Sequence, residues 1–162
     1  MKLLACLLLL LLATPSFSQD FMYLEEIKLK KEADYVEHQE TFVKAIDLLM
    51  SCPIDDENLD RLLCQKFIIT YAEGSPLHTI SLDESISSVI KGNDEILVFY
   101  IGLWVKSLIE NSDQDDSFHT EFVYQNLYEY CKKGNGVKQT KTIKSLIKHG
   151  DDNDIDTWIN EL

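Results

Sequence analysis

One segment near the middle of the chain is apolar on nearly every side of a helix. Residues 95–110 read EILVFYIGLWVKSLIE, and a helix of this composition has no polar face. It must be enclosed by the rest of the protein. It is too short to cross a membrane, which takes roughly 20 apolar residues, and Gly102 interrupts it. We therefore expect residues 95–110 to form the central helix of the fold.

Apolar residues recur at the helical period along most of the chain. The clearest stripe, in residues 35–50, stops at Cys52 because Pro53 disfavours α geometry in the residue before it. Residues 20–31 are expected to extend this helix or to form an earlier one, and a short strand pair within residues 66–82 stays open. Further helices are predicted over residues 59–72, 84–91, 95–110, 118–133, 138–149 and 155–162. The predicted fold is all-α: a compact bundle of six or seven helices built from antiparallel helical hairpins.

Polar and small residues mark the ends of these segments. Asp55 or Asp56 is expected to cap the helix that follows it, and Ser81 to Glu84 fit a capping box. Asn93 is expected to cap the central helix, and Gly150 to end the basic helix near the C-terminus. The inward stripe of the helix after Asp56 is expected to consist of Leu59, Leu62, Leu63 and Phe67.

The first 18 residues have the features of a secretory signal peptide. Lys2 supplies a short positive region, residues 3–13 an apolar one, and Ser16 and Ser18 the small residues that precede cleavage. We expect cleavage to leave residues 19–162 as a single helical domain, exported to the periplasm of a Gram-negative bacterium or secreted. No transmembrane segment is expected after cleavage.

The sequence is strongly acidic, with a formal net charge of −13 over 162 residues. Lys2 is the only charged residue in the predicted signal, so residues 19–162 carry −14. Such a surface repels phosphate, and we therefore predict that nucleic acid is not a partner. One segment departs from this pattern: residues 132–149 contain six lysines and no acid.

The lysines of this segment are the candidate partner-binding patch. Lys141, Lys144 and Lys148 share one helix face, and Lys138 lies just before them. The patch is predicted to bind an anionic partner, such as another envelope or secreted protein, or a membrane surface. The alternative is a solvated face that balances the acidic tail. The oligomeric state stays open.

The motifs of common catalytic and cofactor sites are absent from the sequence. It contains no G-x-S-x-G, no P-loop and no G-x-G-x-x-G. Asp113, Asp115 and Ser117 match an EF-hand loop, but Phe118 replaces the glycine of its turn and Tyr124 its last ligand. These acids are expected to be solvated helix caps. We predict no catalytic residue, no cofactor and no metal site.

The remaining reactive side chains are expected to be structural. Arg61 is the sole arginine and is expected in a surface ion pair. Buried free thiols are the favoured interpretation of Cys52, Cys64 and Cys131, which form no C-x-x-C motif, although a disulfide stays open. Surface positions are expected for the histidines, which are His38, His78, His119 and His149.

Several short segments carry a resemblance. They are the signal followed by Gln19, the E-G-S-P turn at Glu73 to Pro76, the segment from Gly102 to Asn111, and the terminal T-W-I. Together they resemble a set of exported all-helical proteins from Bacteroidetes without an assigned activity. The resemblance implies an all-α exported domain and no catalytic residues.

The expected function is that of a non-enzymatic helical domain that binds another protein. Neutralisation of a basic toxin, in the manner of an immunity protein, is one concrete version, because charge complementarity speeds association. The alternative is a small periplasmic enzyme, hydrolase-like, with a site assembled across helices.

Overall fold

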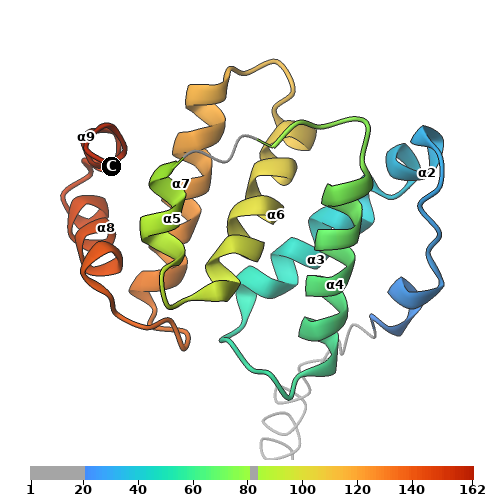
Figure 1. Ribbon diagram of the computed structural model, residues 1–162, viewed down its shortest axis with the longest axis horizontal. Coiled ribbons are helices and arrows are strands. Elements are labelled where there is room, and N and C mark those ends of the chain that lie inside the picture. Colours follow the sequence, from blue (N-terminus) through green and yellow to red (C-terminus); the bar gives the residue numbers. More distant parts are fainter. Residues whose placement is uncertain (1–20, 81–83) are drawn as a thin grey trace, which may run out of the picture.

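The computed structural model describes residues 21–80 and 84–162, so the predicted signal peptide and most of the predicted capping box at Ser81 to Glu84 lie outside the described residues. These two stretches contain no strand, which confirms the all-α prediction (Figure 1). The elements are η2 (Met22–Glu26, a 3₁₀ helix), α2 (Glu32–Glu37), α3 (Gln39–Ser51), α4 (Leu59–Gly74), α5 (Glu84–Ile90), α6 (Asp94–Glu110), α7 (Asp116–Lys132), α8 (Lys141–Asp151) and α9 (Ile155–Asn160).

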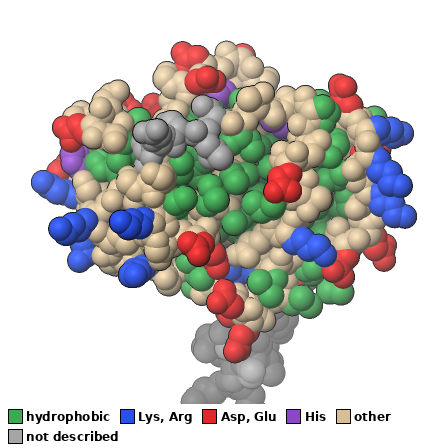
Figure 2. Space-filling model, in the orientation of Figure 1, with side chains coloured by type: hydrophobic (Ala, Val, Ile, Leu, Met, Phe, Trp, Pro, Cys, Tyr) green, Lys and Arg blue, Asp and Glu red, His purple; other side chains and the backbone are tan. Residues whose placement is uncertain are grey.

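α6 lies in the middle of the bundle, with α3, α4, α5 and α7 packed against it (Figure 1). Gly102 lets α3 approach closely, because a Cβ atom there would lie 2.7 Å from Ile46 Cδ1. The enclosure is incomplete along one strip, where Leu97, Val98 and Ile101 are only half-buried. Figure 2 shows hydrophobic side chains at the surface between α5 and α4, over α6. The expected central helix is present, but it is not covered on every side.

Eight α-helices occur in the described residues, against the six or seven predicted. The extra helix arises because the predicted 35–50 helix is divided at His38, whose backbone (φ −101°, ψ 12°) leaves α geometry between α2 and α3. The alternative of a strand within residues 66–82 is wrong for residues 66–80, since α4 continues to Gly74 and the segment after it is not a strand. None of the helices in residues 21–80 and 84–162 has the length and apolarity to cross a membrane.

Two expected helix ends are wrong. Asn58, not Asp55 or Asp56, caps α4: its side-chain oxygen accepts a hydrogen bond from the Arg61 N–H at 3.1 Å. Gly150 does not end α8, which runs on to Asp151. A Cβ atom at Gly150 would lie 2.3 Å from the Tyr128 ring, so glycine is needed there for close packing of α8 on α7.

The core face of α4 also differs from the prediction. Leu63 and Phe67 are buried as expected, but Leu59 and Leu62 are 55% and 42% exposed. The buried face is rotated away from them and includes polar and sulfur-bearing side chains that the leucine stripe did not indicate. Its members are Arg61, Leu63, Cys64, Phe67, Ile68 and Tyr71.

Candidate functional site

The segment that leads into α8 is fixed to the turn before α6. The Asn93 amide donates to the Lys138 carbonyl at 3.0 Å, and its side-chain oxygen accepts from the Lys138 N–H at 2.7 Å. Asn93 is at the N-cap of α6 as predicted, but its side chain makes no cap hydrogen bond there. Thr140 caps α8, since its hydroxyl accepts from the Ile143 N–H at 3.2 Å. The start of α8 is therefore fixed to the turn before α6 by hydrogen bonds.

α8 is strongly amphipathic, and its outer side carries the predicted patch. Ile143 and Leu146 are fully buried, on the side of α8 that packs against α7 and α9. We name the exposed side chains on the outside the lysine face; they are Lys138, Lys141, Lys144 and Lys148. In the part of the chain that the structure describes, none of the four forms an ion pair within 4.0 Å.

Figure 2 shows cationic side chains gathered at the left edge of the molecule, where Figure 1 places α8 and the turns beside it. Lys138 lies against the turn before α6: a Cβ atom at Gly92 would be 3.5 Å from Lys138 Nζ. The exposed Lys91 precedes Gly92 and extends the cluster. The sequence analysis missed Lys91, because only the fold brings the two turns together.

Lys132 does not belong to this group, although it lies in the same basic segment. Its ammonium group contacts the Asp151 carboxylate at 2.6 Å and the Tyr128 hydroxyl at 2.7 Å. The hydrogen bond with Asp151, followed by that with Tyr128, raises the pKa of Lys132, and the same bond with Lys132 lowers the pKa of Asp151. One lysine of the segment is thus neutralised by the acidic tail, while the lysine face is not.

A shallow hollow of about 310 Å³ borders the lysine face. Its floor includes Trp158, which is 3% exposed and donates its indole N–H to the Ser145 hydroxyl at 3.1 Å. The hollow combines one lysine, one acid, three hydroxyls and apolar surface. It is lined by Ser88, Lys141, Thr142, Ser145, Trp158, Glu161 and Leu162.

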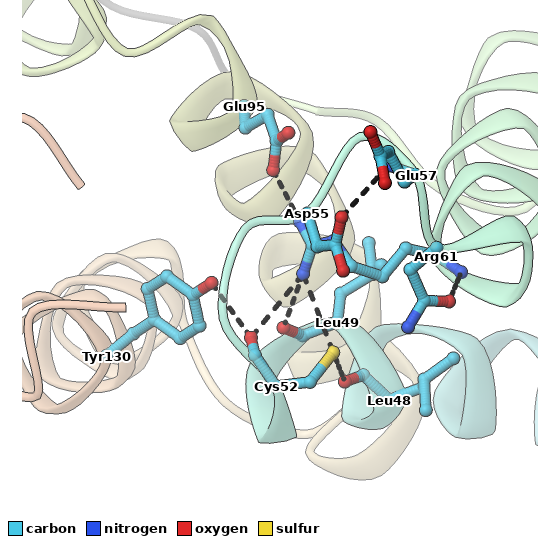
Figure 3. Close-up of polar contacts among 9 residues, drawn as sticks. Leu48, Leu49, Cys52, Asp55, Glu57, Arg61, Glu95 and Tyr130 are labelled. Atoms are coloured by element: carbon cyan, nitrogen blue, oxygen red, sulfur yellow. Dashed lines mark hydrogen bonds and ion pairs between the residues drawn. The ribbon is translucent and has the colours of Figure 1, made fainter. Parts of the chain in front are cut away.

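Arg61 is buried, so its predicted place in a surface ion pair is wrong (Figure 3). Its guanidinium donates to the carbonyls of Leu49 at 3.3 Å and Cys52 at 3.5 Å. It also pairs with Glu95 of α6, and it lies 5.8 Å from the centre of the Phe99 ring. Because the guanidinium is enclosed, it cannot clamp an anion from solvent, and its contacts instead join α3, α4 and α6.

His119 is also buried rather than at the surface, and it contacts a serine. Its Nδ1 lies 2.8 Å from the Ser107 hydroxyl, and the two residues are 1% and 0% exposed. A serine–histidine pair is the starting arrangement for nucleophilic catalysis, but its hydroxyl must meet a substrate. Here the pair is enclosed between α6 and α7, and its geometry supports a role in core packing.

The acidic loop before α7 is a helix cap, as predicted. The Asp115 carboxylate accepts from the Ser117 hydroxyl at 2.6 Å and from the Phe118 N–H at 3.1 Å, and these bonds lower its pKa. No group of three or more potential ligand side chains could hold a metal ion in residues 21–80 and 84–162. Cys52, Cys64 and Cys131 are free thiols, of which the last two are buried as expected and Cys52 is partly exposed.

Comparison of the chain with protein-family models, with curated proteins and with solved structures finds no match. The resemblance to exported Bacteroidetes proteins thus stays a prediction. A function for this chain must therefore be inferred from its own geometry and charges.

Proposed function

We propose that this chain is an exported, non-enzymatic helical domain that binds an acidic surface of another envelope or secreted protein through its lysine face. The observation that carries the proposal is the set of exposed lysines on α8 and just before it. None of them forms an ion pair with a carboxylate whose side chain is described. The chain carries 28 Asp and Glu residues against 15 Lys and Arg, so most of its charged surface is acidic and the lysine face stands out from it.

The spacing of the lysines has an energetic cost that a partner would offset. Lys141 and Lys144 are three residues apart, and Lys144 and Lys148 are four apart, so both pairs are neighbours on the helix surface. Like-charge neighbours at these spacings destabilise a helix by about 0.2–0.5 kcal/mol per pair. Carboxylates of a bound protein would convert this repulsion into attraction.

The electrostatics also favour a single orientation of the partner. Residues 19–162 carry a net charge of −14. An acidic protein is therefore repelled by most of this surface and attracted only near α8. The Asn93–Lys138 hydrogen bonds and the buried face of α8 fix the backbone that carries the lysines before binding, which reduces the conformational entropy that association costs. The hollow beside Lys141 offers room for one side chain of the partner at the edge of the contact.

The proposal is tested by charge reversal with a matched control. The variant K141E/K144E/K148E reverses the lysine face, and K28E/K30E/K31E makes the same change in three exposed lysines near the N-terminus. Cross-linking in envelope extract should give the same defined cross-linked protein with the wild type and the control, and at least tenfold less with the α8 variant. The purified partner should bind more weakly as salt rises. Equal capture by all three proteins would refute the proposal.

A further inference from the structure

A second surface, at the start of α4, exposes large apolar side chains. Leu59 and Leu62 are 55% and 42% exposed, and their spacing of three places them on one side of the helix. They belong to a small group, since only six large hydrophobic side chains in the described residues are markedly exposed. The buried face of α4 does not need them, because Leu63, Cys64 and Phe67 fill it.

Met22 of η2 is 46% exposed, and η2 packs against α4. In a 3₁₀ helix residues three apart share a side, so Met22 lies below Glu25. Glu25 forms an ion pair with Lys66 at 3.6 Å, and Lys66 is one turn beyond Leu62 on the outer side of α4. We name Met22, Leu59 and Leu62 the α4 patch. Figure 2 shows hydrophobic side chains at the lower end of α4, with acidic side chains beside them.

Acidic side chains border the α4 patch. Asp55, Asp56 and Glu57 precede α4 and are all exposed, and none forms an ion pair within 4.0 Å among the described residues. They are not needed to cap α4, because Asn58 does so. The apolar patch and the acidic turn that precedes α4 are both exposed, and the Asp55 carboxylate accepts from the Glu57 N–H at 2.9 Å.

We infer that the α4 patch and its acidic border form a docking surface for a cationic amphipathic helix of a partner protein. Apolar side chains of such a helix would cover Met22, Leu59 and Leu62, and its lysines or arginines would meet the acidic turn. This surface carries the opposite charge to the lysine face and lies on a different part of the bundle, so the chain can contact two unlike partners.

Two other occupants fit the charges poorly. A second copy that met the α4 patch in a symmetric dimer would bring two acidic turns together, since such an interface repeats the same contacts on both sides. A membrane surface with anionic lipids would be repelled by the same acids. A cationic helix alone satisfies both the apolar and the acidic parts of the surface.

The test uses a labelled synthetic helical peptide of leucine and lysine, with leucines on one face, and measures its binding by fluorescence anisotropy. L59Q/L62Q and D55N/D56N/E57Q are each expected to weaken binding at least tenfold. Matched controls should change it less than twofold: V36Q alters an exposed apolar side chain on α2, and D152N/D156N/E161Q removes three exposed charges near the C-terminus. A peptide of the same composition without the apolar face should bind at least tenfold more weakly.

Three results would overturn the inference. Equal losses in the variants and their controls would mean attraction by net charge alone. A dimer in the free protein that L59Q/L62Q abolishes would assign the α4 patch to a second copy. Binding to vesicles with anionic lipid that the same variant abolishes would assign it to a membrane. Circular dichroism of each variant checks that the exposed substitutions leave the fold intact.

Discussion

Arg61 and Glu95 form an ion pair across the contact between α4 and α6 (Figure 3). The arginine side chain is 1% exposed and the glutamate side chain 21%. The same guanidinium donates to the carbonyls of Leu49 and Cys52, at the end of α3, where helical carbonyls lack partners within the helix. Tyr130 of α7 donates its hydroxyl to the same Cys52 carbonyl at 3.0 Å. One polar cluster thus connects four helices at the base of the bundle.

Replacing Arg61 with methionine should strongly destabilise the fold. The change removes the donor from Glu95 and from the Leu49 carbonyl, while the Cys52 carbonyl keeps the Tyr130 hydroxyl. Breaking a buried ion pair costs about 3–5 kcal/mol. Urea unfolding followed by circular dichroism measures this loss in the free energy of unfolding. The control, Glu95→Gln, keeps an acceptor beside the guanidinium and should cost less than half as much. An R61M variant as stable as the wild type would show that the cluster contributes no net stability.

The cysteines should differ in reactivity according to burial. Burial raises the pKa of the Cys64 and Cys131 thiols to about 12, so the reactive thiolate is scarce at pH 8. In the folded protein, iodoacetamide should alkylate neither of them at pH 8 within the time that modifies a small-molecule thiol. Both should react once urea unfolds the chain. Peptide mapping by mass spectrometry separates the sites, and alkylation of Cys64 before unfolding would contradict the prediction.

The sequence predicted most of the helices, because each depends on signals within about ten residues. The stop at Pro53 and the long apolar run over residues 95–110 are examples. The burial of Arg61 and His119 was missed because their partners, Glu95 and Ser107, come from other segments. A single ionisable residue is predicted to be exposed when the sequence near it contains no partner that could pair with it in the core.

The lysine face was also predicted only in part: the sequence indicated the residues on one helix, but not the residue that another segment adds. The spacing of Lys141, Lys144 and Lys148 predicted their common outward side, and the structure shows all three exposed. Lys91 joins them only because the turn before α6 is hydrogen-bonded to the segment before α8. The exposure of Leu59 and Leu62 was also missed, since a leucine stripe on a helix normally faces the core.

Gly102→Ala should destabilise the bundle even though alanine favours helices. The added Cβ would lie 2.7 Å from Ile46 Cδ1, and relieving such an overlap costs about 1–3 kcal/mol, against a gain in helix propensity of about 1 kcal/mol. Ile46→Val removes that methyl group, so the double variant should be at least about 0.5 kcal/mol more stable than the sum of the single changes predicts. Urea unfolding of all four proteins gives the coupling.

The control for this cycle is Gly150→Ala, which meets the Tyr128 ring on the other side of the bundle. Gly150→Ala should also destabilise the protein. When it is combined with Ile46→Val, the losses in the free energy of unfolding should simply add. If Ile46→Val showed the same coupling free energy with both glycine substitutions, it would be loosening the core in general. The contact between Gly102 and Ile46 would then not explain the destabilisation by Gly102→Ala.

His78 should make the stability of the protein fall on mild acidification. It is half-buried after α4, and its Nε2 has no hydrogen-bond partner among the described residues. Burial lowers its pKa below the ordinary value of 6.5, so the folded state favours the neutral ring. Between the two pKa values the unfolded chain binds more protons, and the free energy of unfolding therefore falls as pH drops below about 6.5. Above about pH 7.5 the ring is neutral in both states and this contribution is constant.

Urea midpoints at about pH 7.5, 6.5 and 5.5 measure the slope of stability against pH, in a range above the titration of most carboxylates. His78→Gln should flatten it, and a variant that keeps the full slope would assign the pH dependence to another group.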